Sequence, residues 1–123
     1  MENKQPTPVA ALVSLKSPQS FLQLRQKGRR VIVAPWLVVY SKPNQQKKIR
    51  LGCTLPRYVG TAVTRNRLKR WCREHLRRWA AQIGDDETVD ISLVFRRQQN
   101  EFYRQLSHKE IDAVLSKSLA KVA

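Results

Sequence analysis

The chain has 123 residues, the length of one ordinary domain, and its 41% of apolar residues suffice for one hydrophobic core. Lys and Arg number 24 against 9 Asp and Glu, a formal net charge of +15. A compact domain repels itself at that charge, so a polyanionic partner is the simplest explanation. No stretch resembles a transmembrane helix or a signal peptide, so we expect a cytoplasmic protein with no membrane partner.

The excess of positive charge lies in residues 25–78. That segment holds 16 Lys and Arg against one acidic residue, Glu74, whereas the rest of the chain holds eight of each sign. An even solubilising coat would not be confined to less than half of the chain. The segment is therefore the expected contact surface for a polyanion.

The beginning of the chain predicts a tail and then a helix. Residues 1–14 carry two prolines and no clear periodicity, so we expect a flexible tail followed by a single domain over residues 15–123. A helix is expected from Pro18 to Lys27, with Ser17 as its cap and Gly28 as its end.

The next segment, Val31 to Tyr40, is rich in β-branched and aromatic residues and predicts one strand, with Pro35 indicating an edge position or a bulge. Further elements are expected in this order: a polar loop over 41–48, a strand over 49–55, a turn over 56–60, a helix over 61–83, an acidic loop over 85–87 and a strand over 89–95. Thr61 suits the cap of the long helix and Gly84 its end. The strand over 89–95 is almost continuously apolar, so both of its faces should be covered.

The last expected helix begins at Ser107, where Ser107-His108-Lys109-Glu110 forms a capping box. Its apolar stripe consists of Ile111, Val114, Leu115, Leu119 and Val122. The whole order, α-β-β-α-β-α, predicts an α+β fold in which helices pack against a small sheet.

On a helical wheel the segment 61–83 has two sides. The apolar side consists of Leu68, Cys72, Leu76, Trp79 and Ile83, with Trp71 and His75 at its edge. The opposite arc consists of Arg67, Lys69, Arg70, Arg73, Arg77 and Arg78. Like charges four residues apart destabilise a helix, and Glu74 alone offsets them, so this arc is more than a solvated face. Arginine binds phosphate with its planar fork and stacks on bases, which favours nucleic acid as the partner.

A motif runs from Gly60 to Glu74: Gly-x-Ala-Val-x-Arg-Asn-Arg-x-Lys-Arg-x-x-Arg-Glu. With Arg50-Leu51-Gly52 and Arg57-Tyr58-Val59 before it, this window resembles the protein subunit of bacterial ribonuclease P. The similarity extends more weakly from Leu15 to about Lys121. Its weaker matches are Lys16, Phe21 and Gly28 around the first helix and Val89-Asp90-Ile91 in the strand after the long helix.

The resemblance implies that the protein binds a large catalytic RNA as its partner and helps that RNA remove the 5′ leader of precursor tRNA. The RNA would perform the hydrolysis with Mg²⁺ that is bound mainly by the RNA. No catalytic residue and no metal ligand is therefore expected in the protein. No obligate protein partner is evident. The resemblance also implies a sheet of about four strands with three helices. It further implies a left-handed βαβ crossover, against the usual right-handed rule.

Two sets of site residues follow. The expected RNA-binding residues are Arg50, Arg57, Arg65, Asn66, Arg67, Lys69, Arg70, Arg73 and Arg77. The expected leader cleft, between the first helix and the sheet, holds Phe21, Arg25, Trp36, Val38 and Tyr40. Phe21 and Tyr40 match aromatic cleft positions of the family, where stacking on bases is plausible, although aromatic residues at such places usually belong to the core. Arg25 stands where the family often has a second aromatic, and alternation places Trp36 and Val38 on the strand face of Tyr40.

Other readings of the residues stay open. A general structural or ribosome-associated RNA-binding protein would carry the same charge and bind any structured RNA equally well. A nuclease acting alone needs carboxylates and a base at one site, for which the run 85–87 with Asp90 is the candidate, although a solvated loop also explains it. Cys72 and His75 lie at a spacing that could hold zinc, but Cys53 and His108 are isolated, and free buried thiols are the expected state of both cysteines.

Overall fold

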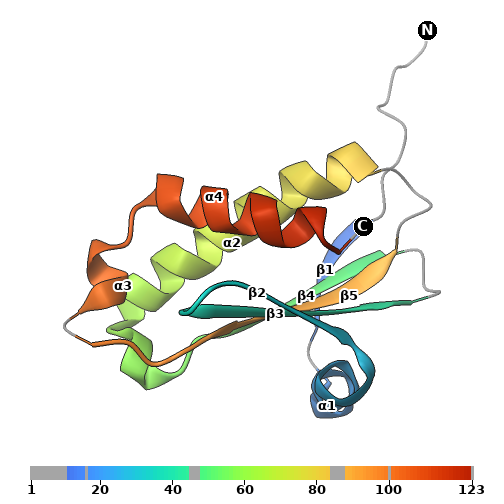
Figure 1. The fold of residues 1–123 in the computed structure, drawn as a ribbon, viewed down its shortest axis with the longest axis horizontal. Coiled ribbons are helices and arrows are strands. Elements are labelled where there is room, and N and C mark those ends of the chain that lie inside the picture. The colour runs from blue at the N-terminus through green and yellow to red at the C-terminus, as the bar shows by residue number, and fades with distance from the viewer. Residues whose placement is uncertain (1–10, 16, 45–47, 84–87, 100, 123) are drawn as a thin grey trace, which may run out of the picture.

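The computed structural model describes residues 11–15, 17–44, 48–83, 88–99 and 101–122. These residues form one five-stranded sheet and four α-helices (Figure 1). The strands are β1 (Ala11–Ser14), β2 (Arg29–Ala34), β3 (Leu37–Pro43), β4 (Lys48–Thr54) and β5 (Val89–Phe95). The helices are α1 (Pro18–Lys27), α2 (Ala62–Ile83), α3 (Phe102–Gln105) and α4 (His108–Ala120), with a 3₁₀ turn over Arg57–Val59. The expected α+β class is confirmed.

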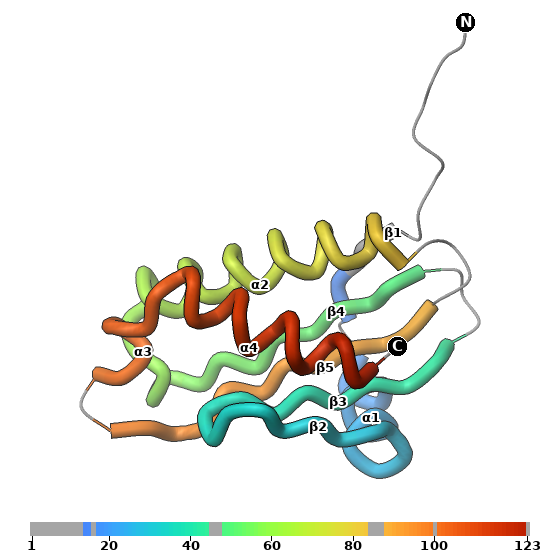
Figure 2. Tube along the Cα trace, turned by 45° about the horizontal axis from the view of Figure 1, so that its top comes forward, coloured from blue at the N-terminus to red at the C-terminus, as the bar shows by residue number. Residues whose placement is uncertain are grey.

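The strand order across the sheet is β1-β4-β5-β3-β2. β4 runs parallel to both β1 and β5, whereas β3 runs antiparallel to both β5 and β2. In Figure 2, α2 lies in front of the sheet, β4 and β5 both run from right to left, and β4 lies above β5. When the view is turned so that both strands point upward, β4 lies to the right of β5. The chain leaves β4, passes in front of the sheet through α2 and enters β5, so it crosses from right to left. The β4–α2–β5 connection is therefore left-handed, as the resemblance implied.

The helices form layers on both faces of the sheet (Figure 1). α2 and α4 cover one face, with α2 beside β1 and β4 and α4 beside β2, while α1 lies against the other face. β5 is buried along nearly its whole length because it is central and covered on both sides. The main core lies between the sheet and the α2–α4 layer, and its fully buried members include Leu68, Leu76, Ile91 and Leu115.

Three parts of the chain differ from the expectation. The single strand expected over 31–40 is a hairpin, because Pro35 and Trp36 form a turn between β2 and β3. Residues 11–14, assigned above to the tail, form β1 and pair with β4, while residues 1–10 lie outside the described residues. The short helix α3 was not expected.

The remaining elements lie close to their predicted bounds. α1 and β5 have the predicted ends, and α2 begins one residue later than predicted. Thr61 caps α2 by accepting a hydrogen bond from the Thr64 amide at 3.3 Å, whereas the Ser17 side chain makes no capping bond to α1. The capping box of α4 is present in both directions. Gly84 and the acidic loop over 85–87 lie outside the described residues.

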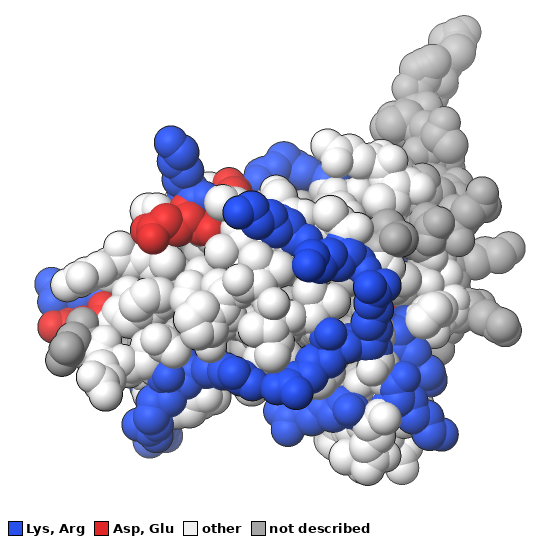
Figure 3. Space-filling model, viewed as in Figure 1, with Lys and Arg blue, Asp and Glu red and all other residues white. Residues whose placement is uncertain are grey.

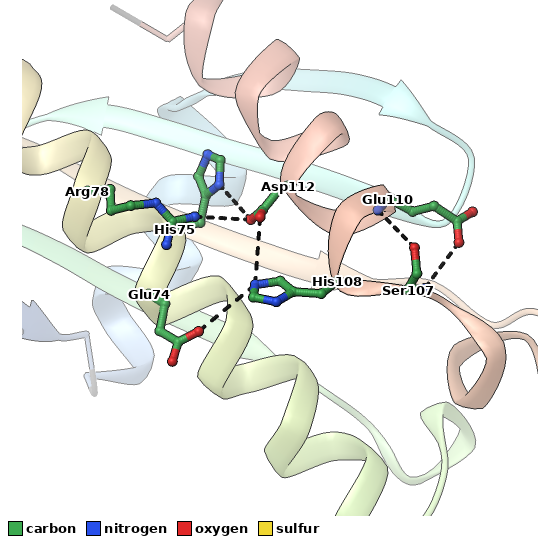
Figure 4. Close-up of polar contacts among 7 residues, drawn as sticks. All are labelled: Glu74, His75, Arg78, Ser107, His108, Glu110 and Asp112. Carbon is green, nitrogen blue, oxygen red and sulfur yellow. Dashed lines mark hydrogen bonds and ion pairs between the residues drawn. The ribbon is translucent and has the colours of Figure 1, made fainter.

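A polar cluster joins α4 to α2 beside the core (Figure 4). Asp112 of α4 lies 2.9 Å from His75 Nδ1 and 3.3 Å from the Arg78 guanidinium, both on α2. His108 reaches toward Asp112 and Glu74 at 3.7 and 3.9 Å. The two helices are thus held by side-chain contacts as well as by their apolar stripes.

Replacing Leu76 by Ala should lower the free energy of unfolding by about 2–5 kcal/mol, because this side chain is fully buried and its loss leaves a cavity. Urea unfolding would measure the change. Val63→Ala is the matched control on the same helix. Val63 is 76% exposed, so its replacement should change stability by no more than about 0.5 kcal/mol. Equal effects of the two substitutions would contradict the orientation of α2.

Candidate nucleic-acid interface

The solvent-facing arc of α2 forms a shallow groove of about 480 Å³. The α2 groove is lined by Asn66, Lys69, Arg70, Arg73, Glu74 and Arg77. Its four basic side chains are exposed, and none makes a hydrogen bond or an ion pair within the described part of the chain. Five of the nine predicted RNA-binding residues therefore meet on one surface whose charge is free to engage phosphate.

The two arginines at the start of the motif are already engaged. Arg65 is half-buried, and its Nε donates to the Gly60 carbonyl at 3.2 Å. Arg67 donates from one guanidinium nitrogen to the carbonyls of Tyr103 and Arg104 at 3.3 and 2.9 Å. Cations satisfy the unpaired carbonyls at the end of a helix, and here Arg67 does so for α3.

Arg67 also belongs to a stack of side chains. Its guanidinium lies over the Trp71 ring at 5.1 Å, and Trp71 in turn stacks on His108, with ring centroids 4.8 Å apart and planes 4° apart. The stack connects α2 with the start of α4, and Arg67 connects α2 with the end of α3. In this structure Arg67 is a clamp between three helices rather than a free phosphate ligand.

Arg50, also predicted to bind RNA, is paired within the protein. Its guanidinium holds Asp90 of β5 with two bonds of 2.6 Å, and Asn44 donates to the same carboxylate at 2.7 Å. Hydrogen bonding to Asp90 raises the pKa of Arg50 above its already high usual value. A bidentate pair of this kind fixes β4 to β5 and engages Asp90, the one member of the candidate acidic set that the structure describes. Arg57 is exposed and has no side-chain partner among the described residues.

The sheet face on the side of α1, called the α1 face below, carries a row of paired positions. Gly52 of β4 lies beside Ser92 of β5, Ser92 beside Tyr40 of β3, and Tyr40 beside Arg30 of β2. The Phe21 ring of α1 occupies the space above Gly52, since a Cβ there would lie 2.4 Å from it. Phe21 thus covers Gly52, and Tyr40 lies on the other side of the buried Ser92, so the two half-buried aromatic side chains stand on one face with a buried small residue between them.

Not all predicted cleft residues lie on the α1 face. Trp36 is 7% exposed and packs in the main core, with its ring centroid 6.2 Å from that of Phe95. It precedes β3 in the hairpin turn, so the alternation that placed it beside Tyr40 does not extend to it, and its assignment to the cleft is wrong. Val38 does share the face of Tyr40, but only 2% of it is exposed. Arg25 is exposed on α1.

Trp36 is held in place by an aromatic neighbour. The Tyr103 hydroxyl donates to the carbonyls of Trp36 and Arg96, the first at 3.0 Å. Burial raises the pKa of Tyr103, so this donor stays protonated. Tyr58 donates in a similar way to the Phe95 carbonyl at 2.8 Å, with the Arg97 guanidinium 4.6 Å above its ring.

Sequence reasoning missed Arg30 as a member of the α1 face. It is exposed and lies directly opposite Tyr40, so both side chains point to the same side of the sheet. The Pro35-Trp36 turn alone would bring Val31 opposite Tyr40. An irregularity between Ile32 and Ala34 shifts the register by one residue and brings Arg30 there instead, so the turn was not a sufficient signal.

The possible metal ligands do not converge. Cys72 is fully buried, and the neighbouring Cys53 thiol together with burial raises the pKa of Cys72 well above its usual value. His75 is occupied by Asp112. Within the described ranges, no group of three or more His, Cys, Asp or Glu side chains is placed to hold a metal ion.

None of the helices in the described part of the chain is long and apolar enough to cross a membrane.

Known proteins resemble this chain in sequence and in fold. The family model described as Ribonuclease P matches residues 10–122. A "Ribonuclease P protein component" of Desulfatibacillum aliphaticivorans is 50% identical over 82 residues, which are 67% of this chain and 66% of that protein. Another, of Chloroflexus aurantiacus, is 40% identical over 63 residues, 51% of this chain and 46% of that protein. The aligned part thus spans between about half and two thirds of these curated relatives.

A solved structure agrees with the fold over most of the chain. The "RNase P protein from Thermotoga maritima" superposes with a TM-score of 0.75 at 27% sequence identity. The match covers 89% of this chain and 97% of that one. The similarity in fold therefore extends over most of the chain.

Replacing Arg67 by Ala should destabilise the protein by about 2 kcal/mol, because two carbonyls of α3 lose a charged donor. Arg73→Ala is the matched control, since Arg73 is exposed on the same helix without a partner, and should change stability by no more than about 0.5 kcal/mol. Thermal and urea unfolding would compare them. A fully stable Arg67→Ala variant would contradict the clamp.

Proposed function

The chain belongs to the ribonuclease P protein family, and from this membership we propose that it is the protein subunit of a bacterial-type ribonuclease P. In this role it binds the catalytic RNA and the 5′ leader of precursor tRNA and supports removal of that leader. The observation that carries the proposal is the α2 groove, where a motif of this family places four unpaired basic side chains on one surface.

The α2 groove is the proposed contact with the catalytic RNA. Lys69, Arg70, Arg73 and Arg77 follow the helix at spacings of one to four residues, so their side chains form one stripe. Phosphate contacts from such a stripe release counterions and give sequence-independent affinity. Asn66, exposed at the start of the groove, adds an amide that can both donate and accept.

The α1 face is the proposed contact with the leader. Phe21 and Tyr40 are both half-buried and expose part of their rings on either side of Ser92, which is itself only 2% exposed. Bases of the leader would therefore stack on the exposed parts of the two rings rather than enter between them. Arg30 and Arg25 supply positive charge beside it. Stacking accepts any base, which suits leaders of differing sequence.

The chemistry is assigned to the RNA. Hydrolysis of a phosphodiester by a protein needs carboxylates or a base placed around a metal or a nucleophile, and both candidate surfaces are basic. Mg²⁺ held mainly by the RNA would supply the metal. The protein's part is to neutralise phosphate repulsion and hold the leader, and the reducing cytoplasm is the compartment that suits its free cysteines.

Reconstitution tests the function. Adding the protein to a bacterial ribonuclease P RNA at low Mg²⁺ should increase the rate of precursor tRNA cleavage, because the added cations replace part of the metal in screening phosphates. Cleavage of a labelled precursor would be followed with RNA alone, with protein alone and with both. An unchanged rate with both would contradict the proposal, and cleavage by RNA-free protein would assign the activity to the protein itself. Equal affinity for unrelated structured RNA would favour the general RNA-binding alternative.

The α2 groove can be tested by the salt dependence of RNA binding. Arg73→Ala should weaken binding to the catalytic RNA and reduce the slope of log affinity against log salt by about one, as expected when one phosphate contact is lost. Lys109→Ala on α4 is the control, because Lys109 is exposed next to Glu110 and outside the groove. Identical slopes for both variants and the unchanged protein would remove the groove from the interface.

A further inference from the structure

A second basic surface lies at the opposite edge of the sheet from the α2 groove. Figure 3 shows a band of Lys and Arg that runs from the C-terminal half of α4 down across the edge of the sheet to the side of α1, while the acidic residues gather toward the other end of α4. The exposed basic residues of these elements are Lys27 of α1, Arg29 and Arg30 of β2, and Lys117 and Lys121 at the end of α4. These five residues are called the β2-edge band.

The charge of this band is not neutralised within the protein. Among the described residues, none of the five has a hydrogen bond or an ion pair through its side chain. α1 and β2 contain no acidic residue, and both acidic residues of α4 lie in its first two turns. One of them, Asp112, is already occupied by His75 and Arg78. Such an uncompensated surface fits a polyanion.

Two consecutive arginines make the band continuous with the α1 face. Successive side chains of a strand point to opposite faces of the sheet. Arg30 is paired with Tyr40 and points to the α1 face. Arg29 is paired with Ser41, and Ser41 is paired on its other side with the core residue Ile91. Arg29 therefore points to the side of α4. β2 is the outermost strand here and α4 packs beside it, so Arg29 leads on to Lys117 and Lys121.

The band is separate from the proposed contact with the catalytic RNA. In Figure 2, α2 lies over β1 and β4, whereas β2 forms the opposite edge of the sheet. The groove is lined by α2 residues alone, and the residues of the band belong to α1, β2 and the end of α4. A single strand that leaves the α1 face beside Tyr40 meets Arg30 and then the edge of the sheet. It would not reach the α2 groove by that route.

We propose that the β2-edge band binds the phosphate backbone of the distal 5′ leader, as single-stranded RNA that passes from the α1 face around β2 toward the end of α4. The inference rests on the proposed function and extends the path of the leader beyond the two aromatic side chains. Because the band offers charges and no aromatic ring, it binds without base preference and depends strongly on salt.

The test compares leader lengths in the reconstituted holoenzyme. Precursor tRNAs with leaders of about four and about twelve nucleotides would be bound to the enzyme carrying Arg29→Glu, Lys117→Glu and Lys121→Glu together. We expect about a tenfold loss of affinity for the long leader and little change for the short one, because only the long leader reaches the band. Lys109→Glu, at the other end of α4, is the charge-matched control and should alter neither.

The outcomes are distinguishable. Equal losses for both leaders, or no loss for either, would overturn the band as a leader site. Vesicles rich in anionic lipid provide a further arm: loss of vesicle binding by the triple variant without any leader-length effect would assign the band to a membrane surface instead. Thermal unfolding confirms that the variant folds, and the single variant Lys117→Glu should show a smaller loss in the same direction. Failure of the proposed function would appear separately, as no activation of the RNA by the unchanged protein.

Discussion

The arrangement of charge in this protein depends on the packing of α2 against the sheet. Leu68, Cys72 and Leu76 are fully buried on one side of this helix. Burying a large apolar side chain stabilises by about 1.5–3 kcal/mol, whereas a like-charge pair four residues apart on a helix costs about 0.2–0.5 kcal/mol. The stripe therefore holds α2 in place although its outer arc repels itself. That same fixed orientation presents the arc to a partner as a rigid surface, so little ordering is needed on binding.

Sequence patterns predicted those elements whose signal is local. The bounds of α1, α2, β5 and α4 follow from amphipathic periodicity, capping residues and a continuous apolar run. The hairpin of β2 and β3 was missed because both strands are apolar and the turn between them, Pro35-Trp36, lacks the Gly or Asn that usually marks a hairpin. β1 was missed because four residues carry no period and their partner, β4, lies more than thirty residues away.

The candidate site was predictable by residue type and less so by role. Arg50, Arg67 and Arg73 are the same residue in or near one motif, yet one pairs with a carboxylate, one clamps helix carbonyls and one stands free. What decides between these roles is the distance to a fixed acceptor on another element. Those acceptors, Asp90 and Arg104, are about forty residues distant in the chain, so no local pattern contains them. A motif match therefore identifies a basic surface more reliably than it identifies the contacts of each arginine.

The position of β5 has a consequence for how the chain is made. β5 lies between β4 and β3, so the pair β1–β4 and the pair β2–β3 have no hydrogen bonds to each other except through it. On a ribosome the chain appears from its N-terminus, and domains fold as units once their elements are available. Residues 89–95 therefore have to leave the exit tunnel before the sheet can close. Until then the basic segment 25–78 is synthesised but its two strand pairs are not joined, so its charge is carried by a chain whose sheet is still incomplete.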